Sequence, residues 1–272
     1  MILRCLIVTR ADEYEILRFN DGRFTWENDL VVEERRVEIF VNGQPYVSVM
    51  ATPDQLEYLA AGYLFTEGAV SRVSDITNIS VNGLNIHVQV HGRTPVAPAR
   101  ARSSGFGLGS VRLQDTQIEN INIIKAVPPP IRAELIVEMM EEFNQLSELF
   151  WKTGAVHSAW LVSGEQKYFS EDVGRHNALD KVIGQYLSNV AAPSNQTGLI
   201  FTTGRISTEM LLKAAKAGMC ALISRGSASR PAVELAEKLN IILVGFSRGD
   251  HFTAFHGGHY ISTPDNNGEP ND

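Results

Sequence analysis

Three segments in the C-terminal half of the chain combine arginine, glycine and hydroxyl side chains, which are the residue types that bind phosphate oxygens. Arginine offers a planar fork of N–H donors to an oxyanion, and glycine lets the backbone approach a ligand closely. Each segment directly follows a short apolar run that is typical of a buried strand. We therefore predict a site for a phosphate-bearing ligand. Its residues are Thr203, Gly204, Arg205 and Ser207, then Ser224 and Arg225, and then Phe246, Ser247, Arg248, Gly249, Asp250 and His251.

The elements around these segments predict that the three arginines meet at one edge of a sheet. Apolar runs at 199–202, 220–223 and 241–244 alternate with helical patterns at 207–217 and 231–239. Strands that alternate with helices pair in parallel through right-handed crossovers, and such sheets bind ligands beyond the carboxyl ends of the strands. This arrangement predicts an anion cradle for a nucleotide or a diphosphate. The alternative is that the arginines pair with surface acids.

The residues before this series add a helix and a strand pair to the same domain. Helical spacing over 131–150 is followed by strand patterns at 155–162 and 167–169, and then by a helix at 175–187. This order predicts a three-layer α/β domain. His157 shares a strand face with apolar neighbours, which indicates a core histidine more than a catalytic one. Phe246, at the start of the third segment, either stacks on a base or fills the core.

The N-terminal part predicts a smaller α+β domain. Asn-Gly turns divide 36–49 and 79–90 into hairpins. Between the hairpins, Thr52, Pro53 and Gln55 form the pattern of a helix start, with Thr52 as the capping hydroxyl. Apolar residues recur at helical spacing after this start, so the helix is expected to cover one face of the hairpin layer.

A change of composition separates the two domains. Glycine, proline, serine and arginine dominate residues 92–112, where no acid occurs. This flexible loop is either a solvated connector or a basic flap that meets an anion or an acidic partner. Three consecutive prolines follow and cannot continue a helix or a central strand. We therefore predict an N-terminal domain over 1–125, an α/β domain over 126–262 and a disordered tail over 263–272.

Composition narrows the class of protein. The 272 residues are 44% hydrophobic and 20% charged, which is ordinary for a globular protein. The net charge of −7 argues against nucleic-acid binding, whose affinity comes from a basic surface, so an anion site must be local. No apolar run approaches the roughly 18 residues of a membrane span, and residues 1–10 do not resemble a secretory signal. Cys5 and Cys220 are too few for a disulfide framework, so a reducing cytoplasm is the expected location.

The run 171–181 is the densest polar stretch of the chain. Asp172 and His176 lie four residues apart and could share a helix face, but two ligands do not make a metal site, and we expect no metal. We interpret the run as a polar network that orients a ligand or supports the loop before the helix.

Several of these runs together resemble the formate dehydrogenase accessory protein family, FdhD/NarQ. The runs are 41–43 with 50–53, 59–64 with 67–68, 153–157, 171–181, 203–207 with 209–210, and 244–246. The resemblance implies a homodimer with a cytidine-deaminase-like α/β domain beside a smaller N-terminal domain. It also implies a role in sulfurating the molybdenum bis-guanine-dinucleotide cofactor for formate dehydrogenase, with sulfur received from a cysteine desulfurase. Residues 246–251 match the family segment assigned to that cofactor, of which GDP is a mimic.

In this family a Cys-Gly-x-Cys-Gly loop carries a persulfide, and at the matching place this chain has Gly105 and Leu108. A persulfide needs an exposed, activated thiolate. Cys5 is distant in sequence, and Cys220 falls in a predicted buried strand, where a cysteine is an inert hydrophobe. Sulfurtransferase activity therefore needs a thiol from elsewhere. The alternatives are a catalytically silent paralogue that acts as cofactor carrier or apo-enzyme chaperone, and a nucleotide-binding enzyme of unknown reaction. Zinc deamination is not expected, because the chain has no Cys-x-x-Cys pair and no acid follows His157 where a proton shuttle would lie.

Overall fold

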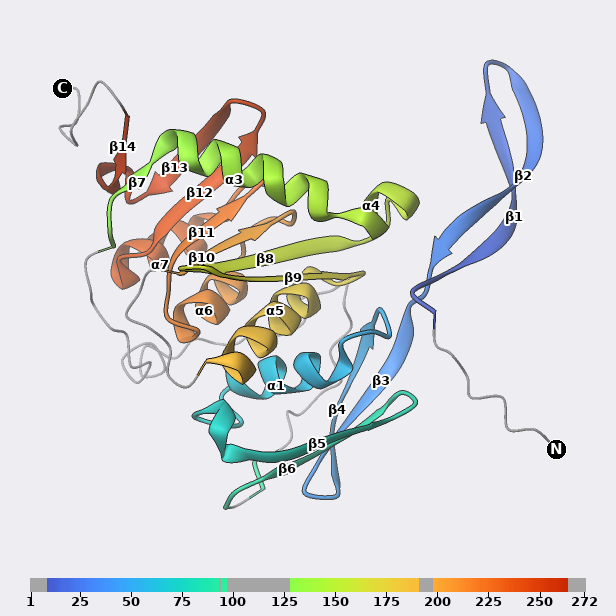
Figure 1. Ribbon diagram of the computed structural model, residues 1–272, viewed down its shortest axis with the longest axis horizontal. Coiled ribbons are helices and arrows are strands. Elements are labelled where there is room, and N and C mark those ends of the chain that lie inside the picture. Colours follow the sequence, from blue (N-terminus) through green and yellow to red (C-terminus); the bar gives the residue numbers. More distant parts are fainter. Residues whose placement is uncertain (1–8, 93, 97–127, 191–197, 264–272) are drawn as a thin grey trace.

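The computed structural model describes residues 9–92, 94–96, 128–190 and 198–263. Its larger part is built on a six-stranded sheet with the order β13-β12-β11-β10-β8-β9 (Figure 1). The strands β10, β11 and β12 are parallel, as predicted, and β8, β9 and β13 add antiparallel pairs at the two sides. Their bounds are β8 (His157–Ser163), β9 (Gln166–Asp172), β10 (Gly198–Thr202), β11 (Met219–Ser224), β12 (Ile242–Arg248) and β13 (His251–His256).

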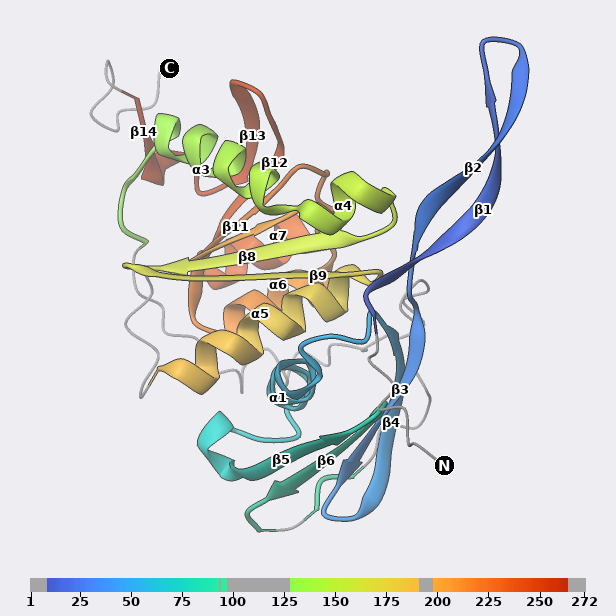
Figure 2. The ribbon, with the colours of Figure 1, turned by 45° about the vertical axis from the view of Figure 1, so that its right-hand side comes forward.

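Helices cover both faces of this sheet (Figures 1 and 2). One face packs against α5 (Arg175–Asn189), α6 (Thr208–Lys216) and α7 (Arg230–Leu239), and the other packs against α3 (Ala133–Leu146). Side chains alternate between the two faces along each strand, so Ile200 of β10 joins the first core and Phe201 joins the second. The predicted three-layer α/β architecture is confirmed. A two-stranded sheet of β7 (Ile131–Arg132) and β14 (Ile261–Ser262) lies beside it.

The predicted helix over 131–150 is wrong in one respect, because it is divided into two helices. The second is α4 (Glu148–Thr153), and the break lies at Ser147, whose ψ of 63° is not helical. The buried Ser147 hydroxyl is hydrogen-bonded to the hydroxyl of Ser158 at 2.9 Å. This bond to β8 holds the chain out of helical geometry and turns α4 toward the edge of the sheet.

The N-terminal part contains a four-stranded sheet with the order β4-β3-β6-β5 and one helix, α1 (Leu56–Thr66). The two predicted hairpins are present. Helix α1 is apolar nearly all round, because it lies between this sheet and α5 (Figure 2). Short 3₁₀ turns lie at Val73–Asp75 and Gly258–Tyr260. The strands are β3 (Arg35–Val41), β4 (Gln44–Ala51), β5 (Ile76–Asn82) and β6 (Asn85–Val90).

The predicted capping role of Thr52 is wrong. Helix α1 begins at Leu56, after Gln55, which has a left-handed backbone with a φ of 50°. The Thr52 hydroxyl instead accepts a hydrogen bond from the backbone N–H of Val173 at 3.2 Å. The backbone N–H of Thr52 donates to the Asp172 carboxylate at 3.1 Å. Tertiary contacts with the larger domain therefore use the groups that a helix start would have used.

A hairpin that the sequence patterns did not reveal projects away from the body of the molecule (Figures 1 and 2). It consists of β1 (Ala11–Asn20) and β2 (Arg23–Val32), and we call it the arm. Neither strand of the arm pairs with another strand in the part of the chain that the structure describes. Most of the basic loop predicted over 92–112, most of the predicted domain boundary and all but the first residue of the tail predicted over 263–272 lie outside the described residues.

Candidate functional site

A cavity of about 290 Å³ lies at the edge of the sheet where β10, β11 and β12 end. Thr203 follows β10, Arg225 follows β11 and Arg248 ends β12, so all three predicted segments reach this edge. Cationic and polar groups stand on one part of the wall, and apolar side chains complete it. The lining residues are Phe150, Gly154, Ala155, Val156, His157, Val173, Thr203, Arg225 and Arg248.

Arg225 and Arg248 are held in place without carboxylates. The guanidinium of Arg225 lies 5.7 Å from the ring centroid of Phe150, a cation–π contact. Arg248 donates from Nε to the backbone oxygen of Arg225 at 3.0 Å. Burial lowers the pKa of Arg225, and the charge of Arg248 lowers it further. Within the described residues no carboxylate forms an ion pair with either arginine, so neither charge is neutralised there.

The other predicted residues of these segments do not all face the cavity. The buried Ser224 hydroxyl donates to the backbone oxygen of Gly204 at 2.5 Å and accepts from the backbone N–H of Gly226 at 2.9 Å, so it fixes two loops together. Ser207 caps α6 through a bond from the Met210 N–H at 3.4 Å. Ser224 and Ser207 therefore stabilise the loops and the helix start at the edge of the sheet.

Further along β12, the predicted residues divide between core and solvent. Ser247 is buried. Gly249 and Asp250 form the exposed turn between β12 and β13, His251 is exposed at the start of β13, and all three lie outside the cavity lining. Arg205 is exposed, and its backbone lies against Gly226, where an added Cβ would be 3.1 Å from the Arg205 nitrogen.

Phe246 has a strained backbone and an exposed ring. Its φ of 53° lies in the left-handed region, which costs a bulky residue about 1–3 kcal/mol. Its N–H donates to the backbone oxygen of Gly226 at 2.9 Å, which ties the strained residue to the Arg225 loop. Because the side chain is 44% exposed, the interpretation of Phe246 as a core residue is wrong. Stacking on a base stays a prediction.

His157 lies in the cavity wall and not in the core, contrary to the interpretation from the strand pattern. It is the first residue of β8, so its side chain reaches the sheet edge. Its Nδ1 is 3.2 Å from the Thr203 hydroxyl, which also accepts a bond from the Ser158 N–H at 3.1 Å. Burial lowers the pKa of His157, and the nearby charges of Arg175 and His176 lower it further. The imidazole is therefore neutral at pH 7.

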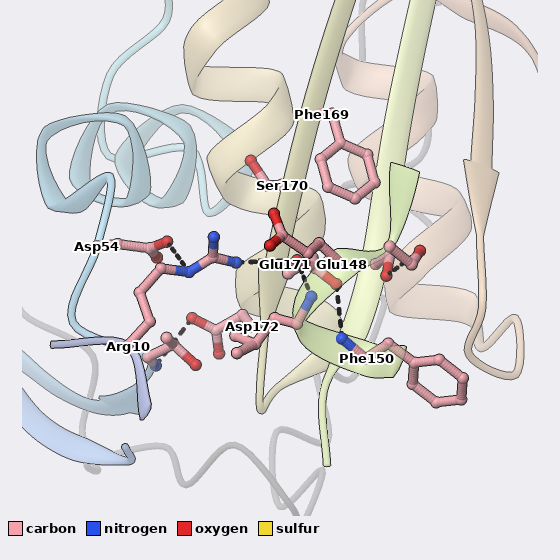
Figure 3. A network of polar contacts seen from close by, with 12 residues as sticks. Arg10, Asp54, Glu148, Phe150, Phe169, Ser170, Glu171 and Asp172 are labelled. Atoms are coloured by element: carbon pink, nitrogen blue, oxygen red, sulfur yellow. Dashed lines mark hydrogen bonds and ion pairs between the residues drawn. The ribbon is translucent and has the colours of Figure 1, made fainter. Parts of the chain in front are cut away.

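Glu171 connects the cavity wall to the N-terminal part of the chain (Figure 3). Its buried carboxylate accepts hydrogen bonds from the backbone N–H groups of Leu149 and Phe150, at 3.1 and 3.0 Å, and so holds the start of α4. Arg10 forms ion pairs with Glu171 and with Asp54, each at 2.9 Å. Glu171 thereby places Phe150, the ring under Arg225.

The rest of the polar run joins the two domains. Lys181 is completely buried and pairs with Asp172 at 2.8 Å and with Asp54 at 2.6 Å. Asn177 donates to the backbone oxygen of Met50 at 2.7 Å and to Asp172 at 2.9 Å. Of the two roles we predicted for this network, support of the loop before α5 is the one that the contacts describe. Asp172 precedes α5 and bonds to Lys181, so it does not share a helix face with His176.

The chain is similar to proteins of a known family. Residues 32–262 match the model of the FdhD/NarQ family. The chain belongs to the FdhD/NarQ family. The family resemblance predicted from the motif runs is confirmed.

Relatives align over nearly the whole chain. The sulfur carrier protein FdhD of Bacillus pumilus (strain SAFR-032) is 34% identical over 254 residues, which cover 88% of this chain and 93% of the relative. The FdhD protein of Streptomyces avermitilis is 33% identical over 271 residues, covering 93% and 96%. The crystal structure of a formate dehydrogenase accessory protein from Desulfotalea psychrophila superposes with a TM-score of 0.76 and 25% identity, over 93% of this chain and all of that chain.

Cys220, one of the two cysteines of this FdhD/NarQ chain, is packed inside the sheet. It is buried in β11, and its Sγ–H donates to the backbone oxygen of Gly198 at 3.3 Å. Burial raises the pKa of the thiol to about 11. The prediction of an inert cysteine in a buried strand agrees with this placement. Over the residues that the structure describes, no three His, Cys, Asp or Glu side chains gather as a metal site, and no helix is long and apolar enough to cross a membrane.

Proposed function

We propose that this chain serves formate dehydrogenase as an accessory protein that binds the molybdenum bis-guanine-dinucleotide cofactor at the cavity and passes sulfur to it from a cysteine desulfurase. Relatives named sulfur carrier proteins and a similar solved structure of a formate dehydrogenase accessory protein support this role. The cofactor is the cargo of the reaction. The desulfurase that supplies the sulfur and the apo-enzyme that receives the cofactor are the proposed partners, and a cytoplasmic location stays a prediction.

One observation carries this proposal: Arg225 and Arg248 meet at the cavity with no carboxylate paired to them in the described part of the chain. Guanidinium pairs suit the oxygens of a phosphate ester, and the neutral His157 beside them can donate a hydrogen bond without adding repulsion. A cavity of about 290 Å³ is at the small end of ligand sites, so it suits one nucleotide part of the cofactor. The exposed ring of Phe246, nearby on β12, is the candidate for stacking on guanine.

The first test is the binding of GDP as a mimic of the cofactor. Arg248→Ala is expected to weaken GDP binding by about 1.5–3 kcal/mol, the range for a charge-assisted hydrogen bond, with little change in stability. Isothermal titration calorimetry measures the affinity. Arg230→Ala is the matched control, because Arg230 is 91% exposed and lies on α7. Equal GDP affinity in wild type and Arg248→Ala would remove Arg248 from the site.

The second candidate function is a cofactor carrier that takes no sulfur onto itself. It is favoured by the burial of Cys220 and by Gly105 and Leu108 in place of the family's loop cysteines. In that case the desulfurase would deliver sulfur directly to the bound cofactor, and this chain would only hold the cofactor.

The two candidates differ in one covalent modification. With a pKa of about 11, the Cys220 thiol is about one part in ten thousand ionised at pH 7, and its surroundings exclude a partner's persulfide. We therefore expect no persulfide on Cys220 after incubation with a cysteine desulfurase and ³⁵S-labelled cysteine, as read by mass spectrometry of the native protein. Iodoacetamide labelling of Cys220 in guanidinium chloride is the positive control. A persulfide on native Cys220 would rule out the second candidate, a carrier that takes no sulfur onto itself.

A homodimer is the third part of the proposal. The arm supports it, because an isolated two-stranded hairpin is marginally stable in water and its apolar face is uncovered. A second copy of the chain is the occupant that we propose for this face.

A further inference from the structure

Arg175 is the charged side chain of the run 171–181 whose role the interdomain network does not explain. Every other acidic or basic side chain of the run lies within ion-pair distance of a side chain of the opposite type in the described structure. His176, for example, lies 3.3 Å from a carboxylate oxygen of Glu209. The remaining pairs are Glu171 with Arg10, Asp172 with Lys181, and Asp180 with Lys213. Arg175 forms no ion pair with any described carboxylate.

The position of Arg175 is unfavourable for an unpaired cation. It is the first residue of α5, where the positive end of a 15-residue helix repels a guanidinium. Its Nε is fully buried and has no hydrogen-bond partner in the structure as described. Burial lowers the pKa of Arg175, and the charge of Arg205 lowers it further. Glu209 is close enough to offset part of this, but it forms its ion pair with His176.

The edge of the sheet is shaped to hold this arginine. The side chain of Arg175 lies on Gly204, where an added Cβ would be 2.9 Å from the Arg175 Cδ and 3.1 Å from its Cβ. Gly204 stands between Thr203, which lines the cavity, and Arg205. The absence of a side chain at position 204 therefore lets Arg175 lie beside Arg205, next to the cavity.

We propose that Arg175 and Arg205 form a second oxyanion subsite, adjoining the cavity, that binds a phosphoryl group. Arg225 and Arg248 hold one phosphoryl group of a ligand, and Arg175 with Arg205 holds another. The site as a whole thus selects ligands with two phosphoryl groups over ligands with one. This assignment deepens the proposed function and rests on it for the guanine part of the ligand only.

Two observations favour a phosphoryl group over the carboxylate of a partner protein. A single carboxylate carries one negative charge, whereas this edge gathers four guanidinium groups that no described carboxylate pairs with. Phosphoryl groups also accept hydrogen bonds from several directions, which suits guanidinium groups that come from α5, from two loops and from the end of β12.

The test uses inorganic pyrophosphate and inorganic phosphate, titrated by calorimetry into the full chain. Wild type is expected to bind pyrophosphate more tightly than phosphate. Arg175→Met keeps the length that packs on Gly204 but removes the charge, and we expect it to weaken pyrophosphate binding about 10-fold or more. The matched control Arg230→Met, at an exposed position on α7, should bind as wild type does. Acetate, as a carboxylate probe, should not compete.

A second variant distinguishes a loss of binding at the subsite from a folding defect. Gly204→Ala keeps both charges but places a Cβ within 2.9 Å of the Arg175 side chain, so the guanidinium must move. We expect it to weaken pyrophosphate binding while its urea midpoint stays near that of wild type. Pyrophosphate binding that is unchanged in both variants, or absent in wild type at millimolar concentration, would overturn the subsite.

The outcome with GDP separates this inference from the proposed function. GDP that binds wild type and Arg175→Met equally tightly would overturn the subsite and leave the proposed function standing. Pyrophosphate binding that depends on Arg175, in a protein that binds no GDP, would overturn the cofactor proposal and leave the subsite standing.

Discussion

Cations inside this molecule are held in two different ways, depending on the partner. The buried Lys181 and Lys213 each pair with a buried aspartate, at 2.8 and 2.6 Å. Removing either lysine would leave an uncompensated carboxylate, at a cost of about 3–5 kcal/mol. Arg225 rests on an aromatic ring and Arg248 on a backbone oxygen, neither of which cancels a full charge. The lysines therefore join elements, whereas no described carboxylate neutralises the charges of the two arginines.

At the residue scale, His157 makes folding stability depend on pH. Burial and the neighbouring Arg175 lower its pKa in the folded protein below the ordinary 6.5. The unfolded chain then binds more protons than the folded one, so stability falls as the pH drops through 6.5 toward the folded-state pKa. The variant His157→Gln has no titratable group at this position, so it lacks this loss of stability on acidification. Urea unfolding at about pH 7.5 and about pH 5.5 should show a smaller pH-dependent loss in the variant, by about 1.4 kcal/mol for each unit of pKa shift.

The control for this measurement is His251→Gln, because His251 is an exposed histidine at the start of β13. It should lose as much stability as wild type on acidification. Equal losses in wild type and His157→Gln would show that the imidazole titrates as it does in the unfolded chain. That result would contradict a neutral His157 in the cavity wall.

The arginine loops could be predicted from the sequence, and the other cavity residues could not. Arg225 and Arg248 directly follow apolar runs, and the carboxyl ends of parallel strands meet by geometry. The pattern predicted a core position for His157, because alternation places a residue on a face of a strand. It does not indicate how near the residue lies to the edge of the sheet. Arg175 gave no local signal, since an unpaired charge is defined by the tertiary partners that it lacks.

Element types were predicted better than element ends. The parallel strands and the helices α5, α6 and α7 follow from apolar runs and, for α6, from Ser207, whose hydroxyl caps the helix. The ends failed where tertiary hydrogen bonds decide them. Thr52 has the sequence of a cap but bonds to β9 and its loop, and Ser147 interrupts a helical pattern to bond with β8. These partners are distant in sequence, so no local pattern contains them.

At the element scale, two glycines allow α1 and α5 to cross in backbone contact. A Cβ on Gly62 would lie 1.8 Å from the carbonyl oxygen of Asp180, and a Cβ on Gly184 would lie 2.0 Å from that of Tyr58. Alanine favours a helix over glycine by about 1 kcal/mol, but here the backbones would have to separate. We expect Gly62→Ala to destabilise the protein by about 3 kcal/mol, the upper part of the range for overpacking.

Urea denaturation followed by circular dichroism measures this effect as a lower midpoint. Gly258→Ala is the control, because the nearest atom to its added Cβ would be 3.8 Å away. A Gly62→Ala variant as stable as wild type would show that α1 and α5 can move apart freely. The packing of α1 on α5 matters for the whole molecule, because α1 also packs against the N-terminal sheet.

At the scale of the whole molecule, the polar run that identifies the family also attaches its two domains. Asp172 and Lys181 of the α/β domain bind the segment before α1. At the end of that helix, the Thr66 hydroxyl donates to the Asp180 carboxylate at 2.7 Å and accepts a hydrogen bond from Lys213 at 3.0 Å. Through Glu171, the same interface fixes Phe150 and hence Arg225. A change in the docking of the N-terminal domain would therefore move the cavity wall.

Among the described residues, the arm carries most of the large apolar side chains that are exposed. The register of the hairpin places Leu17 opposite Trp26 and Phe19 opposite Phe24, all on one face. Their exposed fractions run from 46% to 69%. The opposite face carries Arg18 with its acidic partners Glu27 and Asp29. Covering the four apolar side chains would bury on the order of 500 Å², a large part of the roughly 800 Å² that each partner of a stable interface contributes.

If a second copy covers this face, replacing its apolar side chains must separate the copies. We expect a variant with threonine at positions 17, 19, 24 and 26 to have the mass of one chain by light scattering at micromolar concentration, where wild type has the mass of two. Threonine keeps the β-propensity of the hairpin, so the arm itself is retained. The control replaces Tyr14 and Val31, which are exposed on the opposite face, and should leave the dimer intact. A four-site variant that remains dimeric would place the contact between copies elsewhere and leave the arm to another partner.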